Sequence, residues 1–566
     1  MVARYVVSPR GGRRAHPDIA SALRAAAARG RAALIEIAPG RYEEFLDVRG
    51  DVELVAAEGA GSVVVGPPRG PVLTAAGSVR IQGLTLVGRE SVVVGCHAGT
   101  LTLDRTEVWA HGGVGVHASP RTSVTLRDSV VAHGRTLFTG GVGLVERCRF
   151  TDAADNAIAV IEGARVTVRG SRIEGSRIHG LRVSDAQAEV VGCELTDTGQ
   201  AALMADTRAR LTVADCAITS VHGEGIMFIE QSRGSVDTTR ITGARHGIAA
   251  ASGADPVVRG CVLTDCRDTG INVQTTARGR FEDCQVLGAR NISVFVTTGG
   301  TPEVHDCRIS RGNVGIAVTE GAGGHFSRIG IEDLTNSALR VRDGAEGLFE
   351  QVRVDRCTLG LDTKGDGGTS AGLTDVVFRD FETAVTALGR SRVTLEGVTA
   401  ERGAVGFFAG EEAQLLVRGC EVTAVSVCGA AVGGQGKLSV RNLTVKASEG
   451  AGVSASDSGY ADVAHSEFTD CASAGAVFTD EGGGRLVDCA VNGTEGPAVR
   501  HNGRVELVSL RTSLPVVQIR PAEPAPTIIN NYTGPVIHGP VHNSQFTWNN
   551  KNVNQHQTTE DGPAHE

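Results

Sequence analysis

The chain has 566 residues, of which 75 are glycine and only 17 are proline, and 4% are aromatic. This composition excludes a collagen or a proline-rich linker protein and favours one large, turn-rich β structure over several ordinary domains. The formal net charge of −9 lacks the basic excess needed to bind nucleic acid or an anionic membrane. We therefore expect no nucleic-acid partner and no membrane partner.

Residues 1–14 contain no apolar signal core, and no apolar run long enough to span a membrane follows them. Thirteen cysteines without an export signal indicate a reducing compartment, and their spacing with histidine does not match a zinc site. The basic residues are almost all arginine, as in proteins from high-GC bacteria. We expect a cytoplasmic bacterial protein without a metal or other cofactor.

An N-terminal cap is expected over residues 1–60. The Ala-rich segment 18–29 predicts a helix, because Ile19, Ala22, Leu23 and Ala26 fall on one face and a glycine follows at position 30. Solenoid proteins need such a cap to cover the open end of the core.

One phrase then recurs through most of the chain. It places a cysteine, or another small or apolar residue, just after a short apolar strand, as in Leu211–Ile218 and Val304–Ile309. That position returns in steps of mostly 22 or 23 residues from Thr106 to Val508. A repeat of this length predicts a solenoid of stacked coils over residues 61–520.

Each repeat holds about three short strands. Leu211 and Val213 alternate, Cys216 and Ile218 alternate with shifted parity, and the parity shifts again at Ile226. Alternation indicates a strand, and each shift indicates a bend, where we expect glycine to supply left-handed backbone. A second column of small residues keeps the same step: Gly180, Ala202, Gly225, Gly247, Gly270, Gly315, Ala338, Gly360, Gly406, Ala476 and Ala498.

This unit resembles the coil of the right-handed parallel β-helix in the pectin-lyase-like superfamily. The segment 34–44 also resembles the "IxIxPGxYxE" entry segment of many β-helix proteins. The resemblance implies an all-β fold, a single-stranded right-handed parallel β-helix of about 18 coils with an N-terminal capping helix.

Enzymes of that superfamily act on polysaccharides through a few charged residues on one face. The sequence contains none of the motifs that mark polygalacturonase-like, methylesterase-like, pectate-lyase-like or uronan-epimerase-like sites. The remaining catalytic candidates are Glu224, His246 and Asp268, which fall at one corner of successive coils. A carboxylate beside a histidine suits acid–base chemistry, whereas solvated corners also carry such residues without function.

A column of cysteines occupies the marker position. A small, buried apolar residue that fills a repeated core slot explains it best, because Ser171, Thr239, Ile329 and Val352 stand in the same column. Its members are Cys148, Cys193, Cys216, Cys261, Cys284, Cys307, Cys420 and Cys489.

The C-terminal end is different in kind. Residues 521–527 read as a Pro-rich linker, and 528–566 as a flexible Asn/Gln-rich tail. Residues 528–557 resemble the amyloid-signalling motifs of multicellular bacteria, which assemble by cross-β stacking; a disordered polar tail is the alternative. The residues expected to carry the interaction are Val536, His538, Gly539, Val541, Gln545, Phe546, Trp548 and Asn549.

Two functions follow from these patterns. The first is a non-enzymatic intracellular scaffold or signalling adaptor that binds protein partners through the solenoid face and assembles homotypically through its tail. The second is a carbohydrate-active enzyme, a lyase, hydrolase or isomerase, which the scarcity of aromatic residues disfavours. A trimeric phage or surface fibre is a third interpretation.

Overall fold

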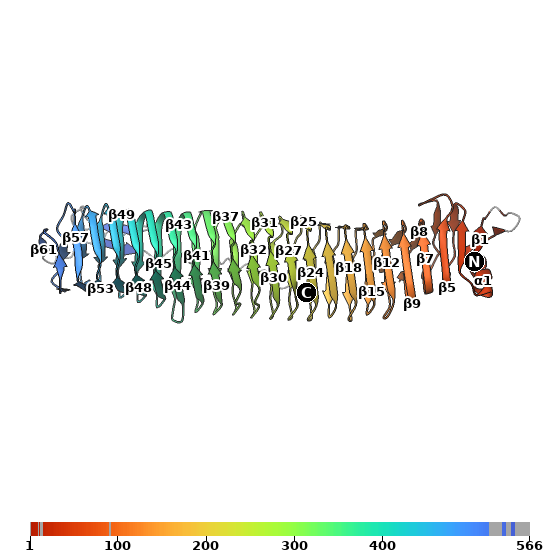
Figure 1. The fold of residues 1–566 in the computed structure, drawn as a ribbon, viewed down its shortest axis with the longest axis horizontal. Helices are drawn as coiled ribbons and strands as arrows, with labels where there is room; N and C mark the ends of the chain where they lie inside the picture. The colour runs from red at the N-terminus through yellow and green to blue at the C-terminus, as the bar shows by residue number, and fades with distance from the viewer. Residues whose placement is uncertain are drawn as a thin grey trace, which may run out of the picture. The chain divides into compact units, whose positions relative to one another are not determined.

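The computed structural model describes residues 2–9, 11, 15–89 and 92–519, together with two strands at 535–538 and 545–548. It contains two compact units, residues 1–335 and 336–566. Each unit is a stack of coils made of short parallel strands (Figure 1).

The predicted capping helix is confirmed as α1 (Ile19–Arg29). Asp18 is its N-cap, and its side chain accepts a hydrogen bond from the Ser21 N–H at 2.6 Å. Gly30 ends the helix in the left-handed conformation, with φ of 59°. The four residues predicted on one face, Ile19, Ala22, Leu23 and Ala26, are all buried.

The entry segment anchors this helix. Strands β3 (Ala33–Ile37) and β4 (Gly40–Tyr42) lead to Glu44, whose carboxylate accepts hydrogen bonds from the N–H groups of Ile19 and Ala20 at 2.9 and 2.8 Å. A carboxylate at this position satisfies free N–H groups and complements the positive end of the helix dipole. The entry segment therefore fixes the helix against the first coil.

One coil of the first unit illustrates the repeat. Strand β24 (Arg210–Ala214) is followed by β25 (Ala217–Thr219) and β26 (Glu224–Phe228). The next coil repeats this order with β27 (Arg233–Asp237), β28 (Arg240–Thr242) and β29 (His246–Ala250). Each strand pairs in parallel with its equivalent one coil later, so the coils build three sheets. We call the sheets containing β24, β25 and β26 the first, second and third sheets.

The third sheet carries the features discussed below. In the first unit it also contains β11 (Val114–Ala118), β14 (Arg135–Thr139), β17 (Ile158–Ile161), β20 (Leu181–Ser184), β23 (Leu203–Asp206), β32 (Thr269–Val273), β35 (Ile292–Val296) and β38 (Val314–Val318).

In the second unit several strands run through the bend between the second and third sheets. The third sheet there contains β41 (Ser337–Arg342), the later halves of β43 (Arg353–Gly365), β45 (Val377–Gly389), β47 (Thr399–Ala409) and β49 (Glu421–Val432), and then β52 (Ala451–Ala455), β55 (Ala474–Phe478), β58 (Val499–His501) and β61 (Val516–Gln518).

The two units together make about 21 turns, more than the 18 predicted from the marker column. The difference arises before Thr106, where β5 (Leu46–Ala56), β7 (Leu73–Gln82) and β9 (Val92–Asp104) already pair in parallel. These long strands run through a bend without the cysteine phrase, so the marker does not detect them.

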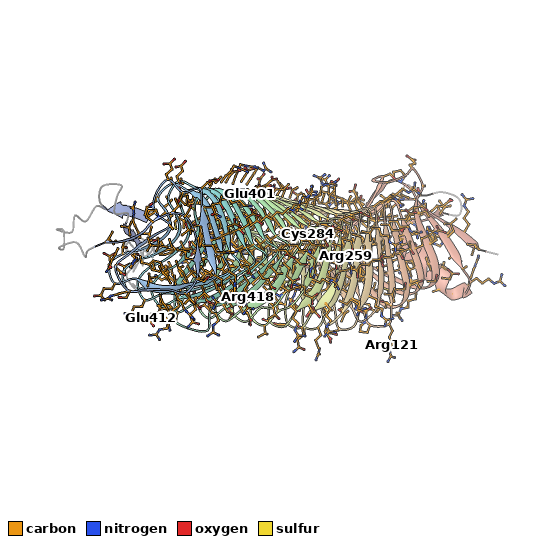
Figure 2. All side chains as sticks on the ribbon, turned by 60° about the vertical axis from the view of Figure 1, so that its left-hand side comes forward. Arg121, Arg259, Cys284, Glu401, Glu412 and Arg418 are labelled. Carbon is orange, nitrogen blue, oxygen red and sulfur yellow. The ribbon has the colours of Figure 1, made fainter. Side chains whose placement is uncertain are left out.

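The cores are built as the alternation predicts. Inward positions carry Val, Ile, Leu and Cys, and phenylalanines such as Phe228, Phe281 and Phe407 have no exposed surface. Charged residues lie on the outside, and Arg121 and Glu412 project from turns between coils (Figure 2). Burial of the apolar ladder supplies the main stabilisation of each coil.

The role predicted for glycine is correct at only some corners. The bend between the first and second sheets has left-handed backbone, but aspartate supplies it at Asp215, Asp283 and Asp306, with φ of 51° to 56°. The second-column glycines are needed for a different reason. A Cβ on Gly247 would lie 2.6 Å from the carbonyl oxygen of Gly270 in the next coil, so the close approach of coils excludes a side chain there.

A separate antiparallel hairpin lies in the C-terminal segment. Strand β62 (Pro535–His538) pairs with β63 (Gln545–Trp548), and Ile537 is opposite Phe546.

Candidate functional site

The structure brings the three predicted catalytic residues together at one edge of the third sheet. Glu224 begins β26 and His246 begins β29, and the two are direct partners in the parallel register. His246 in turn pairs with Thr269 at the start of β32, and Asp268 is the residue before it. Because neighbouring strands are about 4.8 Å apart, the three side chains form a short ladder across successive coils.

His246 is the central group of this ladder. Its Nε2 lies 4.0 Å from Oδ2 of Asp268, and its side chain is only 12% exposed. Its other ring nitrogen, Nδ1, is buried and has no hydrogen-bond partner among the described residues. A buried imidazole nitrogen without a partner is uncommon, because its desolvation is not compensated.

Asp268 is held by its neighbours. Asn291 donates a hydrogen bond from Nδ2 to Oδ1 at 3.3 Å, and Nε of Arg245 lies 3.8 Å from Oδ2. The Arg245 side chain is 60% exposed, so its guanidinium is accessible to a ligand. The Asp268 carboxylate is thus oriented toward His246, and the Arg245 guanidinium lies beside it.

Burial lowers the pKa of His246 below its ordinary value of 6.5, and the nearby carboxylates of Asp268 and Glu224 oppose this shift without cancelling it. At neutral pH the imidazole is therefore uncharged and can accept a proton. The two carboxylates would then stabilise the imidazolium that forms.

His179 occupies the equivalent corner in an earlier coil but is already used structurally. Its ring Nδ1 accepts a hydrogen bond from the Ala201 backbone N–H at 3.2 Å. The backbone N–H of His179 donates to Oδ1 of Asn156. His179 and His246 each precede a glycine at this corner, and only the hydrogen bonds of their ring nitrogens distinguish them.

The sequence did not predict two ion-paired, buried aspartates on the outside of the third sheet, Asp206 and Asp362. In the first unit, Nε of Arg182 donates to Oδ2 of Asp206 at 2.7 Å, and the aspartate side chain is 4% exposed. In the second unit, Asp362 accepts hydrogen bonds from Arg340 and Arg342 at 3.2 and 2.5 Å. In the sequence, an ion pair of this kind is indicated by an arginine and an aspartate at outward positions of strands one coil apart.

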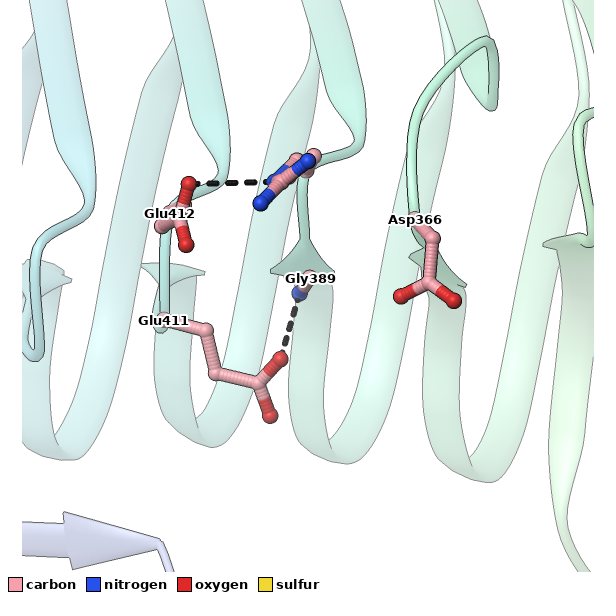
Figure 3. Close-up of a pocket in the computed structure, with 5 residues that line it drawn as sticks. Asp366, Gly389, Glu411 and Glu412 are labelled. Carbon is pink, nitrogen blue, oxygen red and sulfur yellow. Dashed lines mark hydrogen bonds and ion pairs between the residues drawn. The ribbon is translucent and has the colours of Figure 1, made fainter.

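An open depression in the second unit is lined by Asp366, Gly389, Arg390, Glu411 and Glu412 (Figure 3). Glu411 accepts a hydrogen bond from the Gly389 N–H at 2.8 Å, and Arg390 pairs with Glu412 at 3.1 Å. Because Glu411, Arg390 and Glu412 already bind neighbouring groups, the depression is a weaker candidate for a reactive site than the ladder around His246.

The cysteine column is a packing feature, as predicted. All thirteen thiols are free and buried. Cys193 donates from Sγ to the Val191 and Val168 carbonyls, and burial raises the pKa of Cys148 to about 11. Burial therefore keeps the Cys148 thiol protonated and unreactive near neutral pH.

Among the described residues, no group of three or more His, Cys, Asp or Glu side chains could hold a metal ion. Within the same part of the chain, no helix is both long and apolar enough to cross a membrane.

The predicted interaction residues of the tail are only partly described. Val536 and His538 belong to β62, and Gln545, Phe546 and Trp548 belong to β63. Gly539, Val541 and Asn549 lie outside the described residues.

Several solved structures resemble this chain at low sequence identity. The PL6 family alginate lyase AlyGC is 9% identical, covering 91% of this chain and 100% of that chain with a TM-score of 0.27. The periplasmic alginate epimerase AlgG is 10% identical, covering 66% and 78% with a TM-score of 0.24. The pre-mature bacteriophage phi29 gene product 12 is 10% identical, covering 85% and 71% with a TM-score of 0.31. None of these likenesses is strong enough to carry a functional argument.

No curated protein matches the sequence. The family described as "Right handed beta helix region" matches residues 91–219, 201–333 and 405–508, more than half of the chain. These segments coincide with the stacked coils and fix the hand of the solenoid predicted from the repeat. The chain therefore belongs to the right-handed β-helix family.

Proposed function

We propose that the protein is a carbohydrate-active enzyme that performs acid–base chemistry on an acidic polysaccharide, with His246 as the base. The observation that carries this proposal is the His246 imidazole, which is only 12% exposed and lies beside Asp268 and Glu224, and whose pKa burial lowers. The solved alginate enzymes share too little with this chain to add support, so the proposal depends on this ladder alone.

The reaction that this arrangement suits best is β-elimination from a uronic-acid residue. The imidazole of His246 takes the proton from the carbon next to the sugar carboxylate, and that carboxylate stabilises the electron pair left behind. The pair then forms a carbon–carbon double bond and expels the glycosidic oxygen on the adjacent carbon. The departing oxygen takes a proton from the imidazolium, which restores the neutral base.

The neighbouring charges have separate tasks in this scheme. Asp268 and Glu224 stabilise the positive charge that develops on His246. Arg245 pairs with the substrate carboxylate, because its guanidinium is exposed and lies at the same corner. Neutralising that carboxylate makes the adjacent carbon–hydrogen bond more acidic.

The test is to incubate the full chain with a panel of polyuronates and to measure the ultraviolet absorbance of the unsaturated product. His246→Ala should abolish product formation, whereas His465→Ala should leave it unchanged. His465 is a matched control because its Nδ1 also lies near an aspartate, at 3.7 Å from Asp488, but in the second unit. Absence of product from every polyuronate, or equal rates for wild type and His246→Ala, would refute the proposal.

An adaptor that assembles through its tail is a second candidate, and the hairpin β62–β63 is the observation that favours it. The hairpin pairs Ile537 with Phe546 within the segment that resembles amyloid-signalling motifs. A β-hairpin with apolar cross-strand pairs can recruit further strands at its edges.

This candidate predicts that the full chain forms fibrils that bind thioflavin T, and that a chain ending at residue 527 does not. A full chain that stays monomeric under the same conditions would contradict it.

A further inference from the structure

The outer face of the third sheet in the second unit carries an apolar strip. It is formed by buried residues from five neighbouring coils, β45, β47, β49, β52 and β55. We call it the outer strip, and its members are Leu388, Val405, Phe408, Cys428, Ala431, Ala451, Ala474 and Val477, with Val427 packed against them.

The register shows that these side chains point away from the coil interior. In β49, Ala430 and Val432 have no more than 1% exposed surface and follow the inward ladder, so Ala431 between them faces outward. Ala431 pairs with Phe408 in one neighbouring coil and with Ser454 in the other. A Cβ on Gly429 would lie 2.6 Å from a methyl of the interior residue Val445, so Gly429 turns inward and Cys428 lies with Ala431 on the outside.

Outward residues on an uncovered sheet retain solvent contact, but those of the outer strip do not. Phe408 is 4% exposed, Ala431 is 3% exposed and Cys428 has no exposed surface. By comparison, Glu421 and Thr423 at outward positions of the same strand β49 are partly exposed, and Ala424 at the bend is exposed. A contiguous apolar face of this kind needs a partner.

The chain itself supplies a partner of suitable chemistry and reach. The last coil ends with β61 on this same sheet, five strand pairings from β47. Five strand spacings amount to roughly 24 Å, whereas the link formed by residues 520–534 can extend over roughly 50 Å. The hairpin that follows contains Val536, Ile537, Phe546 and Trp548.

We infer that the hairpin of residues 535–548 docks on the outer strip of its own chain. Docking would bury the apolar residues of both partners. This inference does not depend on the acid–base chemistry proposed for the first unit.

Cys428 provides a direct probe, since it is the thiol on the outer strip. In the full chain, Cys428 should react slowly with a maleimide in native buffer. A chain ending at residue 519 should react at Cys428 at least about tenfold faster, as expected when more than about 1.4 kcal/mol of protection is removed. Cys420, which lies in the interior column, is the matched control and should stay protected in both chains, showing that the coils remain folded.

A second variant keeps the tail in place. Ile537→Asp should raise the reactivity of Cys428 as truncation does, whereas Thr558→Asp, beyond the hairpin, should not. Equal reactivity of Cys428 in the full and truncated chains would overturn the inference. Protection that disappears on dilution of the full chain would also overturn it, because the strip would then be covered by a second copy.

Discussion

The chemistry available to a histidine depends on which of its nitrogens are already bonded. His179 and His246 both precede a small residue at the same corner of the third sheet, but His179 accepts a hydrogen bond from the Ala201 N–H. His246 keeps Nδ1 unpaired and directs Nε2 toward Asp268. Burial lowers the pKa of both rings, and at His246 the carboxylate of Asp268 lies 4.0 Å from Nε2.

At the same scale, the sequence could identify the candidates and could not rank them. The sequence predicts that Glu224, His246 and Asp268 lie together, because a fixed repeat places equivalent positions in adjacent coils. The free nitrogen of His246 and the hydrogen bond of His179 depend on side-chain rotamers and on backbone N–H directions, which the repeat does not encode.

At the scale of the strand, the spacing of the coils limits which residues fit. At the bend between the second and third sheets, a Cβ on Gly429 would lie 2.6 Å from the Gly452 carbonyl oxygen and 2.6 Å from a Val445 methyl. Gly419, at the corner before the marker Cys420, has a left-handed φ of 57° and open space around its Cα. Position 429 therefore needs glycine because there is no space for a side chain, whereas position 419 favours glycine because its backbone is left-handed.

This difference gives a paired stability prediction. Gly429→Ala should lower the free energy of unfolding by about 1–3 kcal/mol, since it overpacks the interface between coils. Gly419→Asn should change it by less than about 1 kcal/mol, because asparagine tolerates left-handed backbone. Chemical denaturation followed by circular dichroism measures both, and an equal loss for the two variants would contradict this assignment of roles.

Strand order and inward residues were predictable at this scale, but the state of the outer faces was not. Alternation predicts that Phe408 and Ala431 point outward, and it says nothing about what covers them. The sequence pattern likewise does not show that aspartates such as Asp215 supply left-handed corners, because left-handed backbone is expected first at the abundant glycines.

At the scale of the whole molecule, the repeat determined the fold class. The 22–23-residue step, the three parity changes and the capping helix together specify a parallel solenoid, which the family match confirms. The coil number was underestimated because the N-terminal coils around β5 and β7 lack the marker phrase. Function was less accessible, since a right-handed β-helix serves many activities and the site must be argued from its own geometry.

The role of His246 as base is tested most directly by the pH dependence of the elimination rate on a polyuronate substrate. The neutral imidazole is the active form, so the rate should rise with pH through a pKa below 6.5 and then level off. Asp268 raises the pKa of His246, so Asp268→Asn should move this rise to lower pH while reducing the plateau rate. A rate that falls as pH increases through this range, or a rise that stays at the same pH in Asp268→Asn, would contradict the account.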